Sequence, residues 1–292
     1  MNQAMKNKLI ASVAPLVFVL LWSTGFIGAK YALPYVEPFT LLFIRFVIAL
    51  AVLLLLFAHF KPVLPASWPQ RLHLMFSGLL VHGAYLGGVF SAIKLGMPAG
   101  VCAILVGLQP LLTAFATPYV FKRRIPFLHW IGIAAGFVGI SMVLSNQISL
   151  DGYGAGAVIA AAVALLGITA GTIYQKKITV HTNVLSIAFF QYLSATMLFA
   201  AGSVIFESGH IIWDVQLILA LLWLVFGLSI GAILLLNYLI KNNEAHKVSS
   251  LFYLVPPLTV LEAYFLFNET LGILNVMGMV IVAISVFIVM KK

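Results

Sequence analysis

Charged residues are scarce in this sequence. Its 292 residues include 7 Asp and Glu and 16 Lys and Arg, so 8% are charged, whereas 63% are hydrophobic. Soluble domains carry roughly a quarter charged residues, which excludes a water-soluble globule. The single cysteine, Cys102, excludes an intrachain disulfide, and nothing near it in its apolar run favours a reactive thiolate. These absences predict an integral membrane protein.

Motifs for several activities are also absent. The sequence has no G-x-x-x-x-G-K-[ST] loop for a nucleotide and no H-E-x-x-H zinc site. No pair of carboxylates and no Ser-His couple lies in an apolar segment where it could act as acid, base or nucleophile. We therefore predict neither an enzyme nor a cofactor or metal site. The net charge of +9 does not predict nucleic-acid binding, because membrane topology accounts for it.

Ten apolar segments follow one another along the chain, separated by short polar breaks. At 1.5 Å per residue, each is long enough to cross a hydrocarbon core of about 30 Å. The sequence therefore predicts an all-α integral membrane protein with ten transmembrane helices. Their approximate ranges are 9–29, 37–58, 72–93, 99–120, 127–145, 153–175, 184–206, 214–240, 247–267 and 272–290.

The cationic residues favour one orientation of these helices. With the N-terminus inside, thirteen of the 16 Lys and Arg fall in cytoplasmic segments, Lys30 and Lys94 fall outside, and Arg45 lies within the membrane. Cytoplasmic loops carry an excess of Lys and Arg, so both termini are predicted to be cytoplasmic. We expect a multi-pass protein surrounded by lipid.

The two halves of the chain resemble each other. A shift of 147 positions places Pro110 on Pro257, each in the middle of an apolar run. We therefore divide the chain into two five-helix repeats, residues 1–146 and 147–292. Because five is odd, the second repeat enters the membrane from the opposite face. In secondary transporters such inverted repeats place a binding site near the bilayer midplane, lined by broken helices.

Several short patterns occur in an order typical of a known family. They are Trp22-Ser23-Thr24-Gly25-Phe26, Arg45, Gly107-Leu108-Gln109-Pro110-Leu111, Pro257, Asn268-Glu269 and Gly278. With the ten short-looped helices, they make nearly the whole chain resemble the drug/metabolite transporter superfamily, in its EamA-type branch. The resemblance implies a substrate cavity among the first four helices of each half, with the fifth and tenth helices at the periphery. It also implies a bacterial inner-membrane exporter of small metabolites, commonly amino acids.

Pro110 and Pro257 lie about half-way through their predicted helices by residue count. A proline donates no backbone hydrogen bond and clashes with the carbonyl four residues earlier, so the carbonyls of Val106 and Tyr253 lose their usual partners. In a bilayer these carbonyls need another helix, a water or a ligand. We favour breaks that line a substrate cavity; structural kinks are the alternative. Gln109, at the first break, offers a donor and an acceptor to substrate or to a carbonyl.

Arg45 and Glu262 are the only fully charged side chains well inside the predicted membrane segments, about 10 Å and 9 Å from the outer boundary. Such groups are functional hypotheses by default. Three interpretations remain open. The two groups form a structural ion pair, or they bind the carboxylate and amino group of a zwitterionic substrate, or Arg45 snorkels outward while Glu262 carries a proton.

Other polar residues complete the predicted site. His82 falls near the midplane and could couple proton flow to transport; a neutral histidine bonded to an adjacent helix is the alternative. Trp22, Tyr85 and Tyr253 are candidate cavity walls, because aromatic rings with polar tips can hold an amphipathic solute. Gln191, which matches Arg45 in the other repeat, is predicted to hydrogen-bond between helices. Anchoring or gating is expected of Tyr174-Gln175 and Asn237-Tyr238 near the cytoplasmic ends.

Glycine pairs four residues apart predict close helix contacts. They are Gly83/Gly87, Gly132/Gly136, Gly167/Gly171 and Gly227/Gly231. We expect these contacts within the chain; for the pair Gly132/Gly136 a homodimer is the alternative.

These features favour a secondary carrier that moves a small neutral or zwitterionic metabolite by alternating access, driven by a proton or by the membrane potential. A highly anionic substrate fits poorly, since Arg45 alone could neutralise it. The alternatives are a channel, which would show a ring of charged or polar pore residues, an intramembrane enzyme, and a carrier for a cationic drug-like solute.

Overall fold

The computed structural model describes residues 3–97, 99–122, 124–143, 154–179, 182–267 and 272–290. Every named element in this part of the chain is a helix, as the sequence predicts. In chain order they are α1 (Gln3–Ala32), α2 (Pro38–Phe60), α3 (Trp68–Gly78), η1 (Leu79–Ala84), α4 (Tyr85–Lys94), α5 (Ala99–Val106), α6 (Gln109–Phe121), α7 (Phe127–Val143), α8 (Ala155–Ile178), α9 (Val184–Phe206), α10 (Val215–Trp223), η2 (Leu224–Ala232), α11 (Ile233–Asn242), α12 (Ala245–Ser250), η3 (Leu251–Leu254), α13 (Val255–Phe267) and α14 (Ile273–Met290).

Seven helical segments of the described chain are long and apolar enough to cross a membrane. They are Val13–Ala32, Pro38–Phe60, Trp68–Lys94, Ala155–Ile178, Val184–Phe206, Val215–Asn242 and Ile273–Met290. This makes the chain a multi-pass membrane protein, but it supports only part of the predicted count of ten. The other three predicted segments are α7, which has 17 residues, and two helices that are interrupted, so the number ten stays a prediction.

Both interruptions fall just before the matched prolines. In the first half, α5 ends at Val106 and α6 begins at Gln109, with Pro110 in its first turn. In the second half, the 3₁₀ helix η3 precedes Pro256 and Pro257 at the start of α13. Proline is tolerated in a first helical turn because its missing N–H would have no intrahelical partner there. The broken helices that the sequence predicts are therefore present in both halves.

Two π-helical segments were not predicted. η1 lies within the continuous helical run from Trp68 to Lys94, and η2 lies within the run from Val215 to Asn242. The 147-residue shift carries 79–84 onto 226–231, inside η2, so the two segments occupy matched positions. A π-helical turn re-aims the side chains that follow it and is frequent at functional sites. Hydrophobic patterning carries no signal for such a turn.

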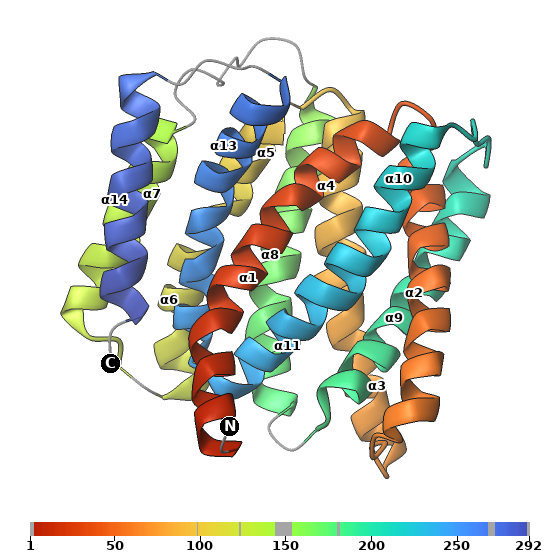
Figure 1. The fold of residues 1–292 in the computed structure, drawn as a ribbon, viewed down its shortest axis with the longest axis horizontal. Helices are drawn as coiled ribbons and strands as arrows, with labels where there is room; N and C mark the ends of the chain where they lie inside the picture. Colours follow the sequence, from red (N-terminus) through yellow and green to blue (C-terminus); the bar gives the residue numbers. More distant parts are fainter. Residues whose placement is uncertain are drawn as a thin grey trace.

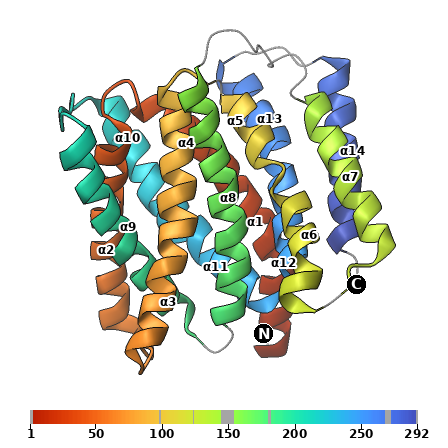
Figure 2. The same cartoon turned by 180° about the vertical axis from the view of Figure 1, so that it is seen from behind.

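The two halves interlock in space. Helix α2 packs against α9, α4 against α8, and α1 against α10 and α13 (Figures 1 and 2). Side chains of the two halves therefore pack against each other in the buried core. The predicted boundary at residue 146 lies outside the described residues, as do Asn268 and Glu269. Helix α1 begins and α14 ends at the same end of the bundle (Figure 1); which end faces the cytoplasm stays a prediction.

Carboxylates from both halves join the start of α2 to the end of α9. Glu207 accepts hydrogen bonds from the backbone N–H groups of Phe39 and Thr40 at 2.6 and 2.7 Å. Glu37 accepts bonds from the N–H and the hydroxyl of Ser208, both at 2.8 Å. The hydroxyl of Ser208 is the main reason that the pKa of Glu37 lies below its ordinary value of 4.5. We call these contacts the α2–α9 clasp.

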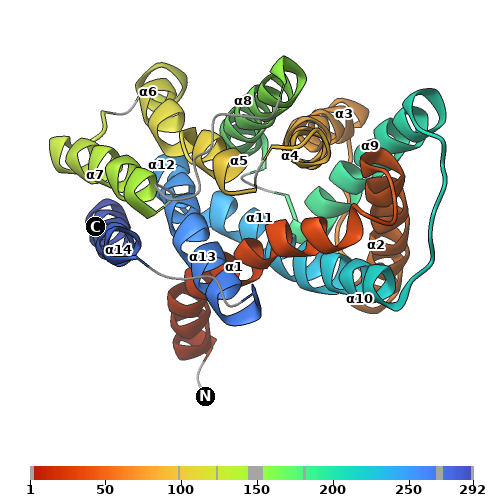
Figure 3. The ribbon, with the colours of Figure 1, turned by 90° about the horizontal axis from the view of Figure 1, so that it is seen from above.

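Helices α7 and α14 lie side by side at the lateral edge of the bundle, at the left of Figure 3. The resemblance likewise implies that the fifth and tenth helices lie at the periphery. Glycines of α7 allow the close approach: a Cβ on Gly132 would lie 2.9 Å from Val289, and one on Gly139 would lie 2.8 Å from Val282. Gly136 faces Ser285 and the ring of Tyr253 in the same way. The chain itself fills this glycine face, so a homodimer, which stays a prediction, would need another surface.

Candidate functional site

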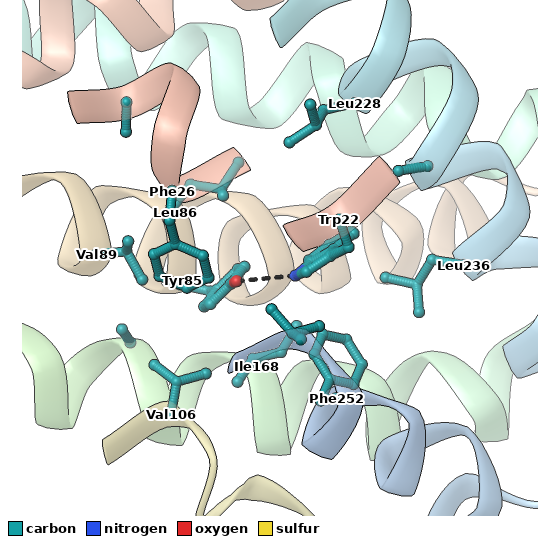
Figure 4. Close-up of a cluster of buried hydrophobic side chains, with 14 of the residues drawn as sticks. Trp22, Phe26, Tyr85, Leu86, Val89, Val106, Ile168, Leu228, Leu236 and Phe252 are labelled. Atoms are coloured by element: carbon teal, nitrogen blue, oxygen red, sulfur yellow. Dashed lines mark hydrogen bonds between the residues drawn. The ribbon is translucent and has the colours of Figure 1, made fainter. Parts of the chain in front are cut away.

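An aromatic pair occupies the centre of the molecule. Trp22 of α1 donates a hydrogen bond from Nε1 to the hydroxyl of Tyr85 at 3.2 Å (Figure 4). The two rings are stacked, with centroids 6.0 Å apart and planes at 12°. Phe252 of η3 meets Trp22 edge-on at 5.3 Å, and Phe18 lies 5.1 Å from it. Side chains from α1, α4 and the second broken helix therefore meet at one point.

The Trp22–Tyr85 pair separates two small cavities. The larger, about 20 Å³, lies on the side of Arg45 and Leu228. The smaller, about 10 Å³, lies on the side of the breaks, at Gly107 and Pro256. The larger volume suffices for roughly one water molecule. Neither admits a metabolite, so the centre of the molecule is closed in this conformation.

Arg45 lines the larger cavity, and no carboxylate of the described residues pairs with it. Its side chain is 1% exposed, and its Nε donates to the hydroxyl of Ser229 at 2.8 Å. Its guanidinium carbon lies 5.6 Å from the centre of the Phe46 ring. Its Nη1 has no hydrogen-bond partner among the described residues. A buried cation with a free donor is costly, so this geometry suits an anionic group that enters the cavity.

His82 and Tyr192 extend the surroundings of Arg45. The imidazole lies 5.1 Å from the Tyr192 ring and 5.3 Å from the Phe46 ring. Tyr192 donates to the carbonyl of Ser229. The side chain of Gln191 lies near His82, but neither ring nitrogen makes a hydrogen bond of normal geometry in the described chain. We call Arg45, His82, Tyr192 and Ser229 the arginine cluster; the two π-helical segments supply His82 and Ser229.

The residues of the breaks also leave polar atoms without partners. Gln109 donates from Nε2 to the hydroxyl of Thr172 at 3.3 Å, while its Oε1 is buried and has no partner among the described residues. The hydroxyl of Tyr253 is likewise buried without a partner. Pro110 and Pro257 are buried at the starts of α6 and α13. The breaks thus concentrate unsatisfied polar groups in the interior, which is unusual in a folded chain.

Glu262 lies in a different place from Arg45. Its Oε1 accepts a hydrogen bond from Ser23 of α1 at 2.5 Å, and its Oε2 has no partner among the described residues. It lines a groove of about 620 Å³ between α1, α10 and α13, with Tyr31 and Trp223 among its walls. Ser23 follows Trp22 on α1, so this helix separates the groove from the central cavities. The ion pair between Arg45 and Glu262, one of three predicted alternatives, is not formed in this conformation.

A ring of amides ties four helices together nearer the end at which α1 begins. Gln191 of α9 donates to Gln175 of α8 at 2.8 Å and to Ser77 of α3 at 3.0 Å. Gln175 donates to Asn237 of α11 at 2.8 Å, and Asn237 donates back to Gln191 at 3.4 Å. All four side chains are fully buried. We call them the amide cluster; the predicted interhelical bonding of Gln191 is confirmed.

The amino-acid sequence also matches a protein-family model. The model of the EamA-like transporter family matches the chain twice, over residues 9–145 and 155–291. The chain belongs to this family. It is therefore an EamA-like transporter with a two-repeat fold, and the predicted family is confirmed.

Relatives of this EamA-like transporter span nearly its whole length. A probable amino-acid metabolite efflux pump of Salmonella typhimurium is 26% identical over 282 residues, covering 94% of this chain and 92% of the relative. The pump of the same name from Escherichia coli (strain K12) is 25% identical, with coverage of 94% and 93%. The uncharacterized inner membrane transporter YedA of Escherichia coli (strain K12) is 27% identical, with coverage of 92% and 87%.

A crystal structure shares the fold of this EamA-like transporter. It superposes with a TM-score of 0.79 at 21% identity and covers 96% of both chains. At this identity the likeness concerns the fold alone.

The predicted site residues fall into three groups. Trp22, Arg45 and Tyr85 line the larger cavity, and His82 lies outside it in the arginine cluster. Gln109, Pro110, Tyr253 and Pro257 lie around the breaks, and Glu262 lies in the groove. Sequence reasoning missed Ser229, Tyr192 and Phe252. A serine in the apolar run around Ser229 was a readable signal, but no pattern showed that η2 turns it toward Arg45.

Proposed function

We propose that this EamA-like transporter exports small neutral or zwitterionic metabolites such as amino acids from the cytoplasm across a bacterial inner membrane, and that it works by alternating access. Two relatives at about a quarter identity are named probable amino-acid metabolite efflux pumps, and another is named an inner membrane transporter. The observation that carries the substrate class is the unpaired Nη1 of Arg45 at the central cavity.

The substrate carboxylate completes the coordination of Arg45 in this proposal. A guanidinium and a carboxylate form charge-assisted, often bidentate hydrogen bonds. Trp22, Phe26 and Tyr85 line the same cavity and offer apolar surface to the substrate side chain. A single cation with no carboxylate beside it among the described residues favours one negatively charged group on the substrate. An amino acid carries such a carboxylate, and its decarboxylated amine does not.

Alternating access requires contacts at both ends of the helix bundle, and these contacts must break one end at a time. The α2–α9 clasp lies at one end, and the amide cluster lies nearer the other. The Trp22–Tyr85 pair closes the centre between them. Substrate entry parts this pair, because the present cavities have room for about one water molecule.

Glu262 is the proton site in this proposal. Its carboxylate lies in a groove, half-buried, with one oxygen unpaired. A proton there removes a charge that is costly within the membrane. The Ser23–Glu262 bond joins α13 to α1, and α1 also carries Trp22, so a change in this bond moves the helix that closes the centre. His82, the other predicted coupling residue, is packed between Phe46 and Tyr192, and we place no proton step on it.

Transport from proteoliposomes tests the proposal. Vesicles are loaded with mixed amino acids, their decarboxylated amines and other small metabolites, with and without a pH gradient, and mass spectrometry identifies the solutes that leave. We expect saturable, gradient-sensitive loss of amino acids and little loss of amines. Unselective leakage would indicate a channel, and a solute of changed mass would indicate an enzyme. Glu262→Gln is expected to abolish gradient-driven transport while amino-acid exchange persists; loss of both would remove the proton role.

A further inference from the structure

A second large cavity opens at the end of the bundle that is predicted to be cytoplasmic. This recess has a volume of about 1000 Å³ and lies among α6, α7, α8, α11, α12 and α14. None of the residues around the Trp22–Tyr85 pair lines it. The recess is therefore separate from the site proposed for the transported metabolite.

The recess is strongly basic. Four cations line it, and Glu244 is the single carboxylate among its described lining residues; the cations are Arg124, Lys176, Lys177 and Lys247. Within the described chain, the side chains of Arg124, Lys177 and Lys247 make no ion pair or hydrogen bond. Charge of one sign that is left uncompensated around a cavity focuses the field on it and favours an anion there.

A pair of histidines forms part of the wall of the recess. His129 of α7 and His246 of α12 meet at 3.1 Å, Nδ1 to Nε2. Burial, opposed by Glu244, lowers the pKa of His246 to about 4, so this imidazole is neutral at pH 7. Nε2 of His246 also lies 3.6 Å from Glu244. The pair links α7 to α12, and His246 adds no positive charge to the recess at pH 7.

Apolar surface continues from the recess onto the outside of the bundle. Val120, Phe121, Leu128 and Ile288 line the recess beside the cations. Other apolar side chains of α6 and α7 are exposed near the recess: Phe115 is 61% exposed, Phe127 79% and Ile131 47%. A ligand that places a charged group among the cations could lay a hydrocarbon chain along these helices. An inorganic anion would contact the cations and leave these apolar side chains uncovered.

We propose that this recess, lined by Arg124, Lys177 and Lys247, binds the phosphate headgroup of an anionic phospholipid whose acyl chains lie along α6 and α7. Basic pockets between transmembrane helices on the cytoplasmic side suit such headgroups. The bound lipid links α6 and α7 to α12, and so joins the peripheral α7–α14 pair to both broken helices.

Native mass spectrometry of the full-length, delipidated protein tests this proposal. The probes are phosphatidylglycerol and phosphatidylcholine with identical acyl chains, and inorganic phosphate and a free amino acid serve as competitors. We expect tighter binding of phosphatidylglycerol in the unaltered protein, which requires no variant to fold. Lys177→Gln combined with Lys247→Gln is expected to weaken that binding roughly 25-fold, at about fivefold for each charge removed.

The matched control removes one cation from the same end of the bundle outside the recess, for comparison with Lys177→Gln alone, which is expected to weaken binding about fivefold. Lys61 follows the end of α2 in a left-handed conformation, which asparagine tolerates. Lys61→Asn is expected to change binding less than about twofold if the recess is specific. Equal binding of the two lipids, or an equal loss in the control, would overturn the proposal. Displacement by inorganic phosphate or by the amino acid would also overturn it, because a soluble anion would then be the ligand.

Discussion

Replacing Arg45 by Met is expected to abolish transport while leaving the folded protein at least as stable as before. Arg45 is buried, has one partner at Nε, and has no carboxylate within 4.0 Å in the described chain. If Arg45 binds a substrate, its unpaired charge destabilises the protein when no substrate is bound, and removing the charge does not lower the free energy of unfolding. If Arg45 is structural, its removal eliminates a stabilising contact and lowers that free energy. The two cases predict opposite changes in stability.

The magnitudes follow from the contacts. Met loses the bond to Ser229, worth about 1.5–3 kcal/mol, and the desolvated contact with Phe46, worth about 2 kcal/mol. The Ser229 hydroxyl keeps a bond to the carbonyl of Leu224 at 3.2 Å, so it is not left without a partner. Against these losses, removing an incompletely paired buried ion recovers several kcal/mol. The free energy of unfolding is therefore expected to stay level or rise.

Arg71 provides a matched control at the surface. Its Nε donates to the carbonyl of Pro65 at 2.9 Å, and its guanidinium carbon lies 5.9 Å from the centre of the Trp68 ring. Arg71→Met removes the same two kinds of contact without relieving a buried charge. We expect it to lower stability slightly and to leave transport unchanged.

Thermal unfolding in detergent and proteoliposome transport measure the two effects. The thermal midpoint of Arg45→Met is expected to equal or exceed that of the unaltered protein, with amino-acid transport lost. A fall in unfolding free energy of about 3–5 kcal/mol, the cost of breaking a true buried pair, would refute the reasoning. Arg45→Lys adds a second test, because it is expected to weaken transport of amino acids much more than that of their decarboxylated amines.

Further predictions concern neighbouring contacts. Trp22→Phe keeps a ring but removes the donor to Tyr85, so stability should fall by about 1 kcal/mol while the transport rate changes severalfold. Gln191→Leu removes hydrogen bonds from three buried partners and should lower the free energy of unfolding, measured by chemical denaturation, by about 3 kcal/mol. Gly139→Ala should separate α7 from α14 and lower the thermal midpoint, since its Cβ would lie 2.9 Å from a backbone oxygen. The stabilising effect of Glu37 should be full above pH 4.5 and disappear as pH falls through its lowered pKa.

A control variant or a contrary outcome accompanies each of these predictions. Trp68→Phe changes an exposed tryptophan that lines neither the central cavities nor the groove of Glu262, and should leave the transport rate unchanged. Gly154→Ala meets nothing within 4 Å and should be neutral. Stability unaffected by Gln191→Leu would show that the amide cluster does not hold the closed form. If the free energy of unfolding of Glu37→Gln still falls at acid pH, other carboxylates cause that fall.

The amino-acid sequence determined the environment and the repeat. Scarce charge and long apolar segments require a membrane, because too few polar groups exist to cover a soluble surface. Pro110 and Pro257 predicted interruptions in two helices, since proline removes a hydrogen bond wherever the chain folds as a helix. These features are local, and the structure places both breaks next to the matched prolines.

Only the tertiary structure decided which polar groups meet. Arg45 and Glu262 have similar predicted depths, yet α1 separates them, because Trp22 and Ser23 point to different sides of one helix. Arg45 hydrogen-bonds to Ser229, 184 positions away in the sequence. Ser229 lies in the π-helical segment η2, which no sequence pattern predicts. The basic recess likewise joins loops from both halves. Depth follows from counting along a helix, but direction depends on how each helix is rotated against its neighbours, and long-range packing sets that rotation.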